Sequence, residues 1–346
     1  MGKKLLNDYT IPQLTALMAQ LGQPAFRAKQ IFRWLHQKRV SSFSQMTDQP
    51  KTLLARLEEE FEIVQLQTAR RQQSKDGTVK FLFTLPDGNC IETVVMRYTY
   101  GNTVCVSTQV GCRMGCRFCA STQAGLVRSL TAGEIAAELY AAEADIGQRI
   151  SHIVLMGIGE PLDNFDNVMD FLTIISCPEG ANIGMRNISL STCGLVPMID
   201  KLAERKLQLT LSISLHAPND AMRSRMMPVN NAYPVAQLIA ACRRYQNTTG
   251  RRISFEYSMV KGVNDSEATA RELARLIRGM GAHVNLIPIN PVDGSPYSAT
   301  DAANVRRFQQ LLTQLGVNAT VRRRLGSDIS AACGQLRREA RREAET

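Results

Sequence analysis

The sequence predicts an α/β protein built on a partial, open (β/α)6 barrel of the TIM type, with a small N-terminal helical accessory domain and a β extension. From about residue 103 onward, short apolar segments of strand length alternate with helical segments, which is the pattern of a parallel sheet. Six such units are too few to close an eight-stranded barrel, so one side is expected to stay open. The first 90 residues lack this alternation and are read separately.

Residues 1–90 form the predicted accessory domain. Apolar residues at helical spacing run from Ile11 to Leu21, with Thr10 as the expected cap and Gly22 as the stop. Further helices are expected over residues 26–37 and 51–62, followed by a hairpin of strands 78–85 and 90–97. The second helix has a basic face formed by Arg27, Lys29, Arg33, Lys38 and Arg39. Such a face is most often a solvated helix surface, and contact with RNA is the alternative.

Residues 91–336 form the predicted barrel core, and residues 337–346 form a charged C-terminal tail. Barrel strands are expected at 103–109, 152–156, 187–191, 208–215, 252–260 and 283–288, with one more strand over 318–323. Helices are expected at 131–147, 164–176, 196–205, 234–248, 266–280 and 301–315. Barrel active sites are built from the loops that follow the strands, so the polar motifs in these loops are expected to converge on one rim.

Three cysteines at the spacing C-x3-C-x2-C give the most specific indication of chemistry, namely Cys112, Cys116 and Cys119. A [4Fe–4S] cluster normally takes four thiolates, so three at this spacing leave one iron open to a small molecule. This spacing is the signature of radical S-adenosylmethionine enzymes. A zinc site needs four ligands, and His152 is too distant to favour one. The nine cysteines are an odd number spread over 346 residues, which disfavours a disulfide framework.

The loops after the other strands supply further polar candidates. Gly157 and Gly159 allow a ligand close access to the backbone, and Glu160 can accept a hydrogen bond from an ammonium group. Neutral groups suited to ribose and adenine are offered by Ser191, Ser214, His216 and Asn290. Each has a plainer interpretation, because a serine at a strand end often caps the next helix. His216 taken alone is read as a rim histidine whose hydrogen bonds are satisfied.

The composition limits the class of protein. The net charge of +10 favours a polyanionic partner, although basic proteins also exist for solubility alone. The 44% of hydrophobic residues suffice for a sizeable core. The longest apolar runs are of strand length, well short of the ~20 residues that span a bilayer, so no membrane association is expected. No secretory signal is expected from the polar N-terminus, and thiols with an oxygen-sensitive cluster indicate a reducing cytoplasm.

The chain resembles, nearly end to end, the RlmN family of 23S rRNA adenine methyltransferases in the radical S-adenosylmethionine superfamily. The resemblance rests on the cysteine motif with its flanks at 109–112 and 119–122, and on segments 156–161, 213–218 and 284–288. Above all it rests on Asp328-Ile329 with the run from Ala331 to Leu336, which is shared only with the closely similar Cfr-type enzymes. The resemblance implies a radical S-adenosylmethionine barrel.

The resemblance also assigns roles to single residues. It gives cluster ligation to Cys112, Cys116 and Cys119, and S-adenosylmethionine contacts to Gly159, Glu160, Ser191, Ser214, Leu215, His216 and Asn290. It makes Cys333 the carrier of the transferred methyl group, Cys105 its resolving partner and Glu92 the proton acceptor. From the residues alone, Cys333 would be a packed small side chain. One departure is Cys193, which stands where the family has serine and, like Cys90, Cys177 and Cys242, is read as structural.

The implied reaction methylates carbon 2 of one adenosine in 23S rRNA, with tRNA left open as a second substrate. Carbon 2 is electron-poor, so the family first places a methyl group on the Cys333 thiolate, and the cluster and a second S-adenosylmethionine then activate that methyl as a radical. Attack by Cys105 on the sulfur of Cys333 frees the product and leaves a disulfide, which an external electron donor must reduce. The expected enzyme is a cytoplasmic monomer.

Three alternatives stay open at this point. A Cfr-type enzyme would methylate carbon 8 of adenine with the same residues. A non-catalytic RNA-binding module would use the cysteines for a structural metal, and bound S-adenosylmethionine would reject that reading. A radical enzyme acting on a peptide would have no need of RNA.

Overall fold

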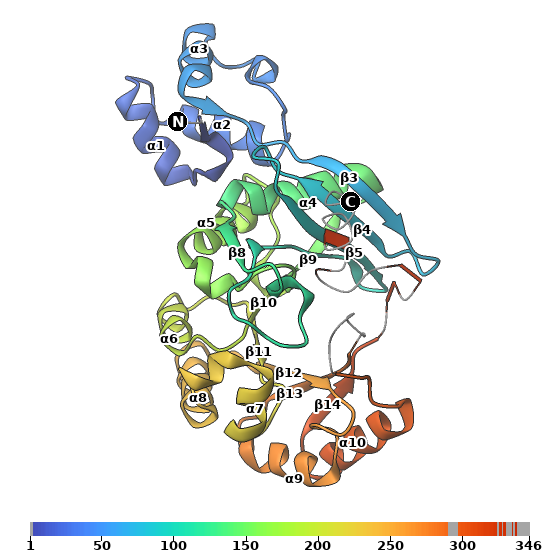
Figure 1. The fold of residues 1–346 in the computed structure, drawn as a ribbon. Coiled ribbons are helices and arrows are strands. Elements are labelled where there is room, and N and C mark those ends of the chain that lie inside the picture. The colour runs from blue at the N-terminus through green and yellow to red at the C-terminus, as the bar shows by residue number, and fades with distance from the viewer. Residues whose placement is uncertain are drawn as a thin grey trace.

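A ten-stranded mixed sheet, curved into a partial barrel, forms the centre of the described molecule (Figure 1). The computed structural model describes residues 3–289, 297–323, 325–326, 328–329, 334 and 336–337. The parallel part of the sheet runs in the order β6 (Gly101–Cys105), β9 (Ile150–Leu155), β10 (Ile188–Thr192), β11 (Thr210–Ser214), β12 (Ile253–Met259), β13 (His283–Pro288) and β14 (Asn318–Val321). The predicted partial, open barrel is confirmed.

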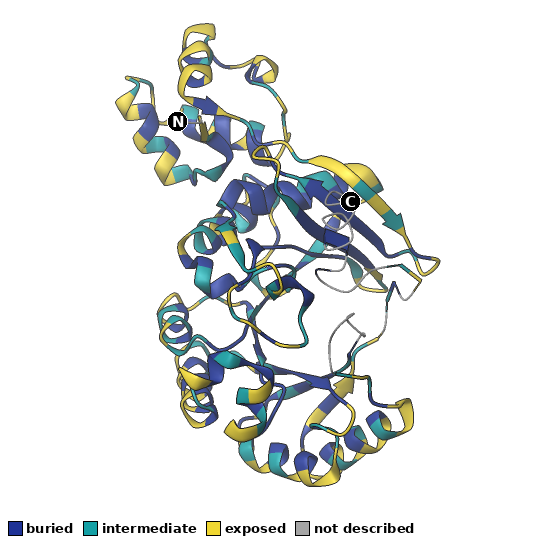
Figure 2. Cartoon of the chain, in the orientation of Figure 1, coloured by how far each residue is buried: buried dark blue, intermediate teal, exposed yellow. Residues whose placement is uncertain are grey.

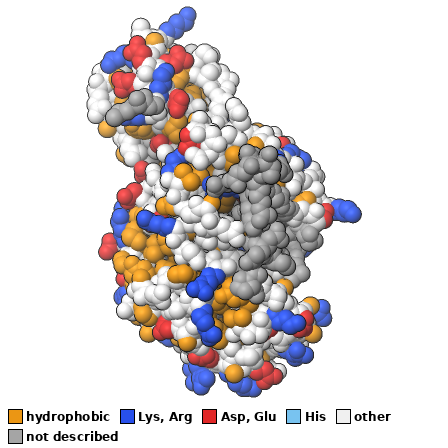
Figure 3. Space-filling model, viewed as in Figure 1, with side chains coloured by type: hydrophobic (Ala, Val, Ile, Leu, Met, Phe, Trp, Pro, Cys, Tyr) orange, Lys and Arg blue, Asp and Glu red, His pale blue; other side chains and the backbone are white. Residues whose placement is uncertain are grey.

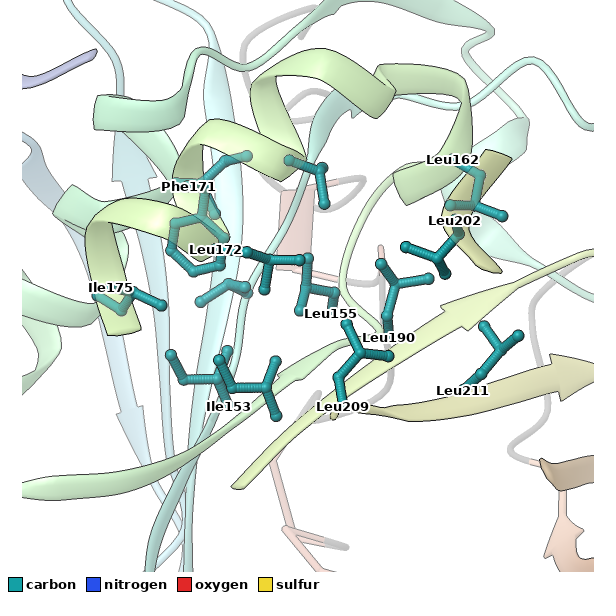
Figure 4. Close-up of a cluster of buried hydrophobic side chains, with 14 of the residues drawn as sticks. Ile153, Leu155, Leu162, Phe171, Leu172, Ile175, Leu190, Leu202, Leu209 and Leu211 are labelled. Atoms are coloured by element: carbon teal, nitrogen blue, oxygen red, sulfur yellow. The ribbon is translucent and has the colours of Figure 1, made fainter. Parts of the chain in front are cut away.

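Helices cover the outer side of this sheet (Figure 1). They follow the strands in turn as α4 (Ala132–Ile146), α5 (Phe165–Ser176), α6 (Val196–Glu204), α8 (Val235–Thr249), α9 (Glu267–Leu276) and α10 (Ala302–Gln314). Successive strand residues point to opposite faces, so Ile153 and Leu155 of β9 pack outward against Phe171 and Leu172 of α5 (Figure 4). The other face of β9 is left for the barrel interior. None of the helices in the described residues is long and apolar enough to cross a bilayer.

Local sequence sets the helix ends where it was expected to. Thr131 caps α4, because its side-chain oxygen accepts from the Glu134 N–H while the Glu134 carboxylate accepts from the Thr131 N–H at 2.9 Å. Gly147 ends the same helix in the left-handed region, at φ 61°. Thr10 starts α1 (Ile11–Gln20) with the same reciprocal arrangement to Gln13.

The N-terminal helices form a lobe beside α4 (Figure 1). It contains α1, α2 (Phe26–His36) and α3 (Lys51–Glu60), with β1 (Lys4–Leu5) paired to β2 (Phe61–Glu62). The predicted helix over 51–62 therefore ends two residues early, because its last two residues join β2. The lobe is fixed to α4 by the Asp8 carboxylate, which accepts from the Gly133 N–H at 2.8 Å. His36 adds a contact of 3.1 Å from its Nδ1 to the Tyr140 hydroxyl.

The basic face of α2 is used in part within the protein. The Lys29 ammonium lies 3.4 Å from Glu179 in the loop after α5, and the Arg39 guanidinium pairs with the buried Glu143 of α4. The Lys38 ammonium lies 3.3 Å from the centre of the Trp34 ring. Two of the five basic side chains thus bind the lobe to the barrel rather than facing solvent alone.

The β extension continues the barrel sheet beyond β6 with antiparallel strands. The predicted hairpin is confirmed as β4 (Val79–Thr84) and β5 (Cys90–Tyr98), and β5 pairs with β6. An edge strand that was not predicted, β3 (Gln67–Gln73), pairs with β4. Its composition is polar and basic and most of its residues are exposed (Figure 2), so it lacks the apolar alternation on which the prediction depended.

The loop between β6 and β9 departs from the prediction. The expected strand 103–109 is divided, because the chain leaves the sheet after Cys105 and starts β7 (Gln109–Gly111), which pairs with β8 (Leu126–Ser129). A short helix after β11, α7 (Asp220–Met226), was also not predicted. Short 3-10 turns occur at Leu6–Asp8, Phe43–Gln45, Ala120–Thr122, Pro161–Asn164, Met185–Asn187 and Pro228–Asn231.

The described residues after β14 lie against the β extension on the far side of the barrel opening. The Gly326 N–H donates to the Asp76 carboxylate at 2.8 Å, and the Asp328 carboxylate accepts from the Lys75 N–H at 3.1 Å and from the Ser74 hydroxyl. Asp76 and its neighbours form the β3–β4 turn. The last strand of the barrel and the first strands of the sheet are thereby joined through the C-terminal part of the chain.

Candidate active site

A cavity of about 250 Å³ lies where the barrel strands end, beside the loop that carries the three cysteines. Its lining includes ten of the residues singled out in the sequence, namely Cys112, Cys116, Cys119, Gly157, Gly159, Glu160, Ser191, Cys193, Ser214 and His216. The convergence follows from the topology, because parallel strands of one sheet end at the same edge.

The cysteine loop presents buried thiols to this cavity. Cys112 and Cys116 are 6% and 9% exposed. Burial raises the pKa of Cys112 to about 12 and raises that of Cys116 further, so both need a nearby positive charge to ionise. Within the described residues, no three His, Cys, Asp or Glu side chains converge on a single ion. A [4Fe–4S] cluster gives each iron its own thiolate, so this loop suits such a cluster better than a single zinc ion.

Glu160 is held by the loops on either side of it. Its carboxylate accepts from the Cys193 N–H at 2.7 Å and from the Leu162 N–H at 3.0 Å. Burial raises the pKa of Glu160, and the two backbone hydrogen bonds act in the opposite direction. A carboxylate has about four acceptor positions, so these two bonds leave room for a cationic donor in the cavity.

The two glycines of the loop after β9 both line the cavity, and they have in addition a packing role that the sequence did not predict. A Cβ at Gly157 would lie 2.6 Å from the carbonyl oxygen of Val106, and one at Gly159 would lie 2.7 Å from the Cβ of Gln109. Gly159 also has φ 113°, which disfavours any other residue. The glycines therefore let this loop pack directly on the segment between β6 and β7, which places Glu160 beside the cysteine loop.

His216 presents a neutral ring to the cavity. Its Nδ1 accepts from the Ser258 N–H at 2.9 Å, which leaves the ring proton on Nε2 as a donor. Burial, with a smaller effect from Arg223, lowers the pKa of His216 to about 3. The ring contacts Phe118 of the cysteine loop edge to face, with centroids 4.9 Å apart. His216 is thus a satisfied rim histidine and also a cavity-lining donor.

The other proposed cofactor contacts are placed differently from one another. Ser191 and Ser214 line the cavity from the ends of β10 and β11. Leu215 is fully buried and is not among the lining residues, and its N–H donates to the Glu256 carbonyl at 3.1 Å. Asn290 lies outside the described residues.

Arg223 of α7 holds this rim together and was missed in the sequence. It is fully buried, and its guanidinium donates to the carbonyls of Cys193 at 2.6 Å, Leu215 at 3.1 Å and Ser214 at 3.2 Å, and to the Asn230 side chain at 3.0 Å. A single side chain therefore ties the loops after β10 and β11. The unpredicted helix that carries it gave no local signal of this long-range role.

The far wall of the cavity is polar and was also missed. Glu256 of β12 and Arg322 after β14 both line it. Burial raises the pKa of Glu256 while the charge of Arg322 lowers it, and the carboxylate accepts from the Asn285 side chain at 2.8 Å. Successive strand residues point to opposite faces, so the alternation along the strands could have identified these side chains as facing the barrel interior.

Cys105 and Glu92 lie on the inner face of the sheet, and neither is among the residues that line the cavity. Cys105 stands opposite Val94 of β5 and Val154 of β9, in an apolar cluster against which Leu325 packs. Glu92 is on the same face of β5, two residues before Val94. Its carboxylate accepts from the N–H groups of Gly334 and Arg337, each at 2.6 Å.

Cys333 lies outside the described residues. Its neighbour Gly334 has φ 80°, and a Cβ there would lie 2.8 Å from the backbone nitrogen of Ser121 in the cysteine loop. Gly334 is therefore in contact with the cysteine loop and, through its N–H, with Glu92.

Comparisons with known proteins agree with this geometry. Residues 106–274 match the Radical SAM superfamily, and residues 5–63 match the Ribosomal RNA large subunit methyltransferase N-terminal domain. The chain is 51% identical over 344 residues to a Clostridium botulinum protein named probable dual-specificity RNA methyltransferase RlmN, with 99% of each covered. A protein of the same name from Desulforamulus reducens is 52% identical, covering 96% of this chain and 95% of the relative.

A solved structure agrees as well. A radical SAM methyltransferase from Sphaerobacter thermophilus superposes with a TM-score of 0.90 at 48% identity, over 96% of this chain and 98% of that one. The similarity covers the N-terminal lobe, the barrel and the C-terminal residues together, and it favours the RlmN interpretation over the Cfr-type one. The chain belongs to the RlmN family of radical S-adenosylmethionine methyltransferases.

Proposed function

We propose that this enzyme methylates carbon 2 of an adenosine in large-subunit ribosomal RNA, with tRNA as a second substrate, through a methyl group carried on Cys333. The observation that carries the proposal is the convergence of three cysteines, two of them buried, and Glu160 on one cavity, with Glu92 next to Gly334. The similarity to proteins named dual-specificity RNA methyltransferases supports RNA as the substrate.

Different residues of the cavity bind the cluster and S-adenosylmethionine. Cys112, Cys116 and Cys119 hold a [4Fe–4S] cluster, which when bound supplies the electron that cleaves S-adenosylmethionine. The Glu160 carboxylate accepts from the amino group of S-adenosylmethionine. Neutral contacts to its ribose and adenine come from Ser191, Ser214, His216, the Leu215 segment and Asn290. His216 suits this role because its ring stays neutral and can donate from Nε2.

The methyl transfer uses two further thiols. The Cys333 thiolate would take the methyl group of one S-adenosylmethionine, which leaves as S-adenosylhomocysteine. That methyl would then lose one hydrogen atom to the adenosyl fragment of a second S-adenosylmethionine, so that its carbon can bond to the adenine ring, and the cluster, when bound, would take up the unpaired electron left on the ring. Glu92 removes the ring proton. The Cys105 thiolate then attacks the Cys333 sulfur, which breaks the bond from that sulfur to the methyl carbon and forms a disulfide. A two-electron donor from outside the protein reduces the disulfide, which suits a reducing cytoplasm. We also propose that the enzyme is a monomer.

Access to the RNA follows from the chemistry of the target. Carbon 2 lies on the edge of the base, so the adenosine must be unstacked or extruded to reach the cavity. The charge of +10 supports contact with phosphates. Lys and Arg side chains are spread over the N-terminal lobe and the barrel on the visible face, interleaved with acidic ones, so no single basic patch stands out there (Figure 3).

The test is product analysis. Anaerobically reconstituted enzyme is incubated with S-adenosylmethionine, reductant and either protein-free 23S rRNA or tRNA in separate reactions. The nucleosides are then separated by liquid chromatography with mass spectrometry against both isomer standards. We expect 2-methyladenosine. Only 8-methyladenosine would move the chain to the Cfr-type group, and no methylated nucleoside from either RNA class would reject the proposal.

A further inference from the structure

Glu92 forms a buried ion pair on the inner face of the sheet with Lys80, a residue that has no role in the reaction as proposed. The Lys80 Nζ lies 2.9 Å from the Glu92 Oε2, and the two side chains are 0% and 3% exposed. Lys80 stands opposite Val94 on the neighbouring strand, two residues from Glu92, so the two charged side chains are diagonal neighbours on one face. Burying an ammonium group is costly unless it is paired, so this arrangement depends on Glu92 being charged.

Among the described residues, three donors surround the two oxygens of the Glu92 carboxylate. Oε2 accepts from Lys80 and from the Gly334 N–H, and Oε1 accepts from the Arg337 N–H. An ionised carboxylate can accept all three, whereas a protonated one would turn one oxygen toward these N–H groups as a donor. The charge of Glu92 therefore holds the backbone of the C-terminal residues at two points.

These two points lie next to the cysteine loop. Gly334 packs so closely on Ser121 that a Cβ would lie 2.8 Å from the Ser121 nitrogen, and Leu336 between the two anchored residues is fully buried. Lys80 of β4 pairs with Val94 of β5, which in turn pairs with Cys105 of β6, so the three residues lie side by side on neighbouring strands. At about 4.8 Å per strand, the Lys80 and Cys105 positions are about 10 Å apart.

We propose that Lys80 is a positioning residue, whose buried ammonium pairs with Glu92 and orients it so that the carboxylate fixes the backbone of Gly334 and Arg337 beside the cysteine loop. The inference rests on the proposed function in one respect, that position 333 carries the methyl group. Glu92 then has two duties, since the carboxylate that accepts the ring proton is also the anchor of the segment that delivers the methyl.

The test is hydrogen–deuterium exchange of the full-length reconstituted enzyme, followed in peptides that contain Gly334 and Arg337. Lys80→Met should speed exchange of these amides about tenfold or more, because it removes the charge that supports two charge-assisted hydrogen bonds. Lys80→Arg keeps the charge and should retain most of the protection. Arg39→Met, which removes another partner of a buried carboxylate, should leave these amides unchanged. Unchanged exchange in Lys80→Met would overturn the proposal.

A second variant covers the case in which Lys80→Met does not fold. The double variant Lys80→Met/Glu92→Gln buries no charge and should fold, yet its single amide oxygen replaces two carboxylate oxygens as acceptor. At least one of the two amides should then exchange faster, and full protection in the double variant would contradict the role of the ion pair.

An activity measurement separates this proposal from the proposed function. In a single turnover, Lys80→Met should lower the rate of methyl transfer to RNA about tenfold or more, with the Kd for RNA changed less than about twofold. Wild-type enzyme that methylates no RNA would end the proposed function, while the exchange result would still decide whether Lys80 anchors the segment. Equal loss of RNA affinity and rate would reject the positioning role.

Discussion

Replacing Arg223 with methionine tests whether one buried cation holds the rim of the cavity. Methionine fills similar space without charge, so the change removes all four hydrogen bonds that the guanidinium donates. The Leu215 carbonyl also accepts from the Ala217 N–H at 2.8 Å, and the bond to the Ser214 carbonyl is only partly buried. The loss therefore falls mainly on the Cys193 carbonyl and the Asn230 side chain, whose bonds are buried.

The expected loss follows from these two acceptors. Each buried acceptor that loses its donor costs about 1–3 kcal/mol, and relief of the buried guanidinium's desolvation offsets part of the sum. We expect the free energy of unfolding to fall by about 2–4 kcal/mol. Because Cys193 also binds Glu160 through its N–H, the affinity for S-adenosylmethionine should fall as well.

The assays are urea unfolding followed by circular dichroism, and calorimetric titration of the reconstituted enzyme with S-adenosylmethionine. Arg223→Lys should recover part of the stability, since an ammonium has three donors. Arg244→Met is the matched control, because Arg244 is an exposed arginine paired with Asp200 and should give no resolvable change. A stability loss in Arg223→Met no larger than that in the control would refute the reasoning.

Four further outcomes are expected. Gly159→Ala should lower the free energy of unfolding, measured with urea, by about 2–5 kcal/mol. Its φ of 113° disfavours a side chain, and the added Cβ would lie 2.7 Å from the Cβ of Gln109. An unchanged stability would mean that the loop relaxes freely. The triple alanine variant at Cys112, Cys116 and Cys119 should contain no cluster iron, and undiminished iron by colorimetric assay would exclude them as ligands. Cys105→Ala should retain RNA covalently through Cys333 on denaturing gels, and normal turnover would reject the disulfide step. Burial lowers the pKa of His36 to about 3, so below about pH 6.5 the unfolded state binds a proton that the folded state does not. This site alone should therefore lower the free energy of unfolding by about 2 kcal/mol between pH 7 and pH 5. A His36→Asn variant should lose correspondingly less stability on acidification, and equal losses would contradict the assignment.

The barrel was predictable because the parallel strands before β14 carry buried apolar residues on their outer face and alternate with helices, as for β9 and α5. The cysteine spacing and the polar strand-end residues likewise indicated the site, because topology brings strand ends together. The close packing that requires Gly157 and Gly159 could not be predicted from the local sequence. The atoms that exclude a side chain there belong to Val106 and Gln109, about 50 residues earlier.

Other parts depended on contacts that no local pattern encodes. Arg223 has the appearance of an ordinary basic residue in sequence, and only the fold surrounds it with four acceptors. The edge strand β3 is held by backbone pairing with β4, so its polar side chains gave no period-2 signal. Lys80 and Glu92 lie on the two strands of a hairpin, and their contact with the C-terminal residues, through the Gly334 N–H, could be found only from the fold.

The anchoring of the C-terminal residues on the β extension has a consequence for the order of folding. The bonds from Gly326 to Asp76, from Asp328 to Lys75 and from Gly334 to Glu92 close loops of 250, 253 and 242 residues. Contacts of such long sequence separation form late, because the chain between them must first be ordered. During synthesis, the cysteine loop and the strands up to β13 emerge well before residues 326–337. Most of the barrel can therefore take shape before these contacts close, and if Cys333 carries the methyl group as proposed, the enzyme becomes competent only with the last few per cent of the polypeptide.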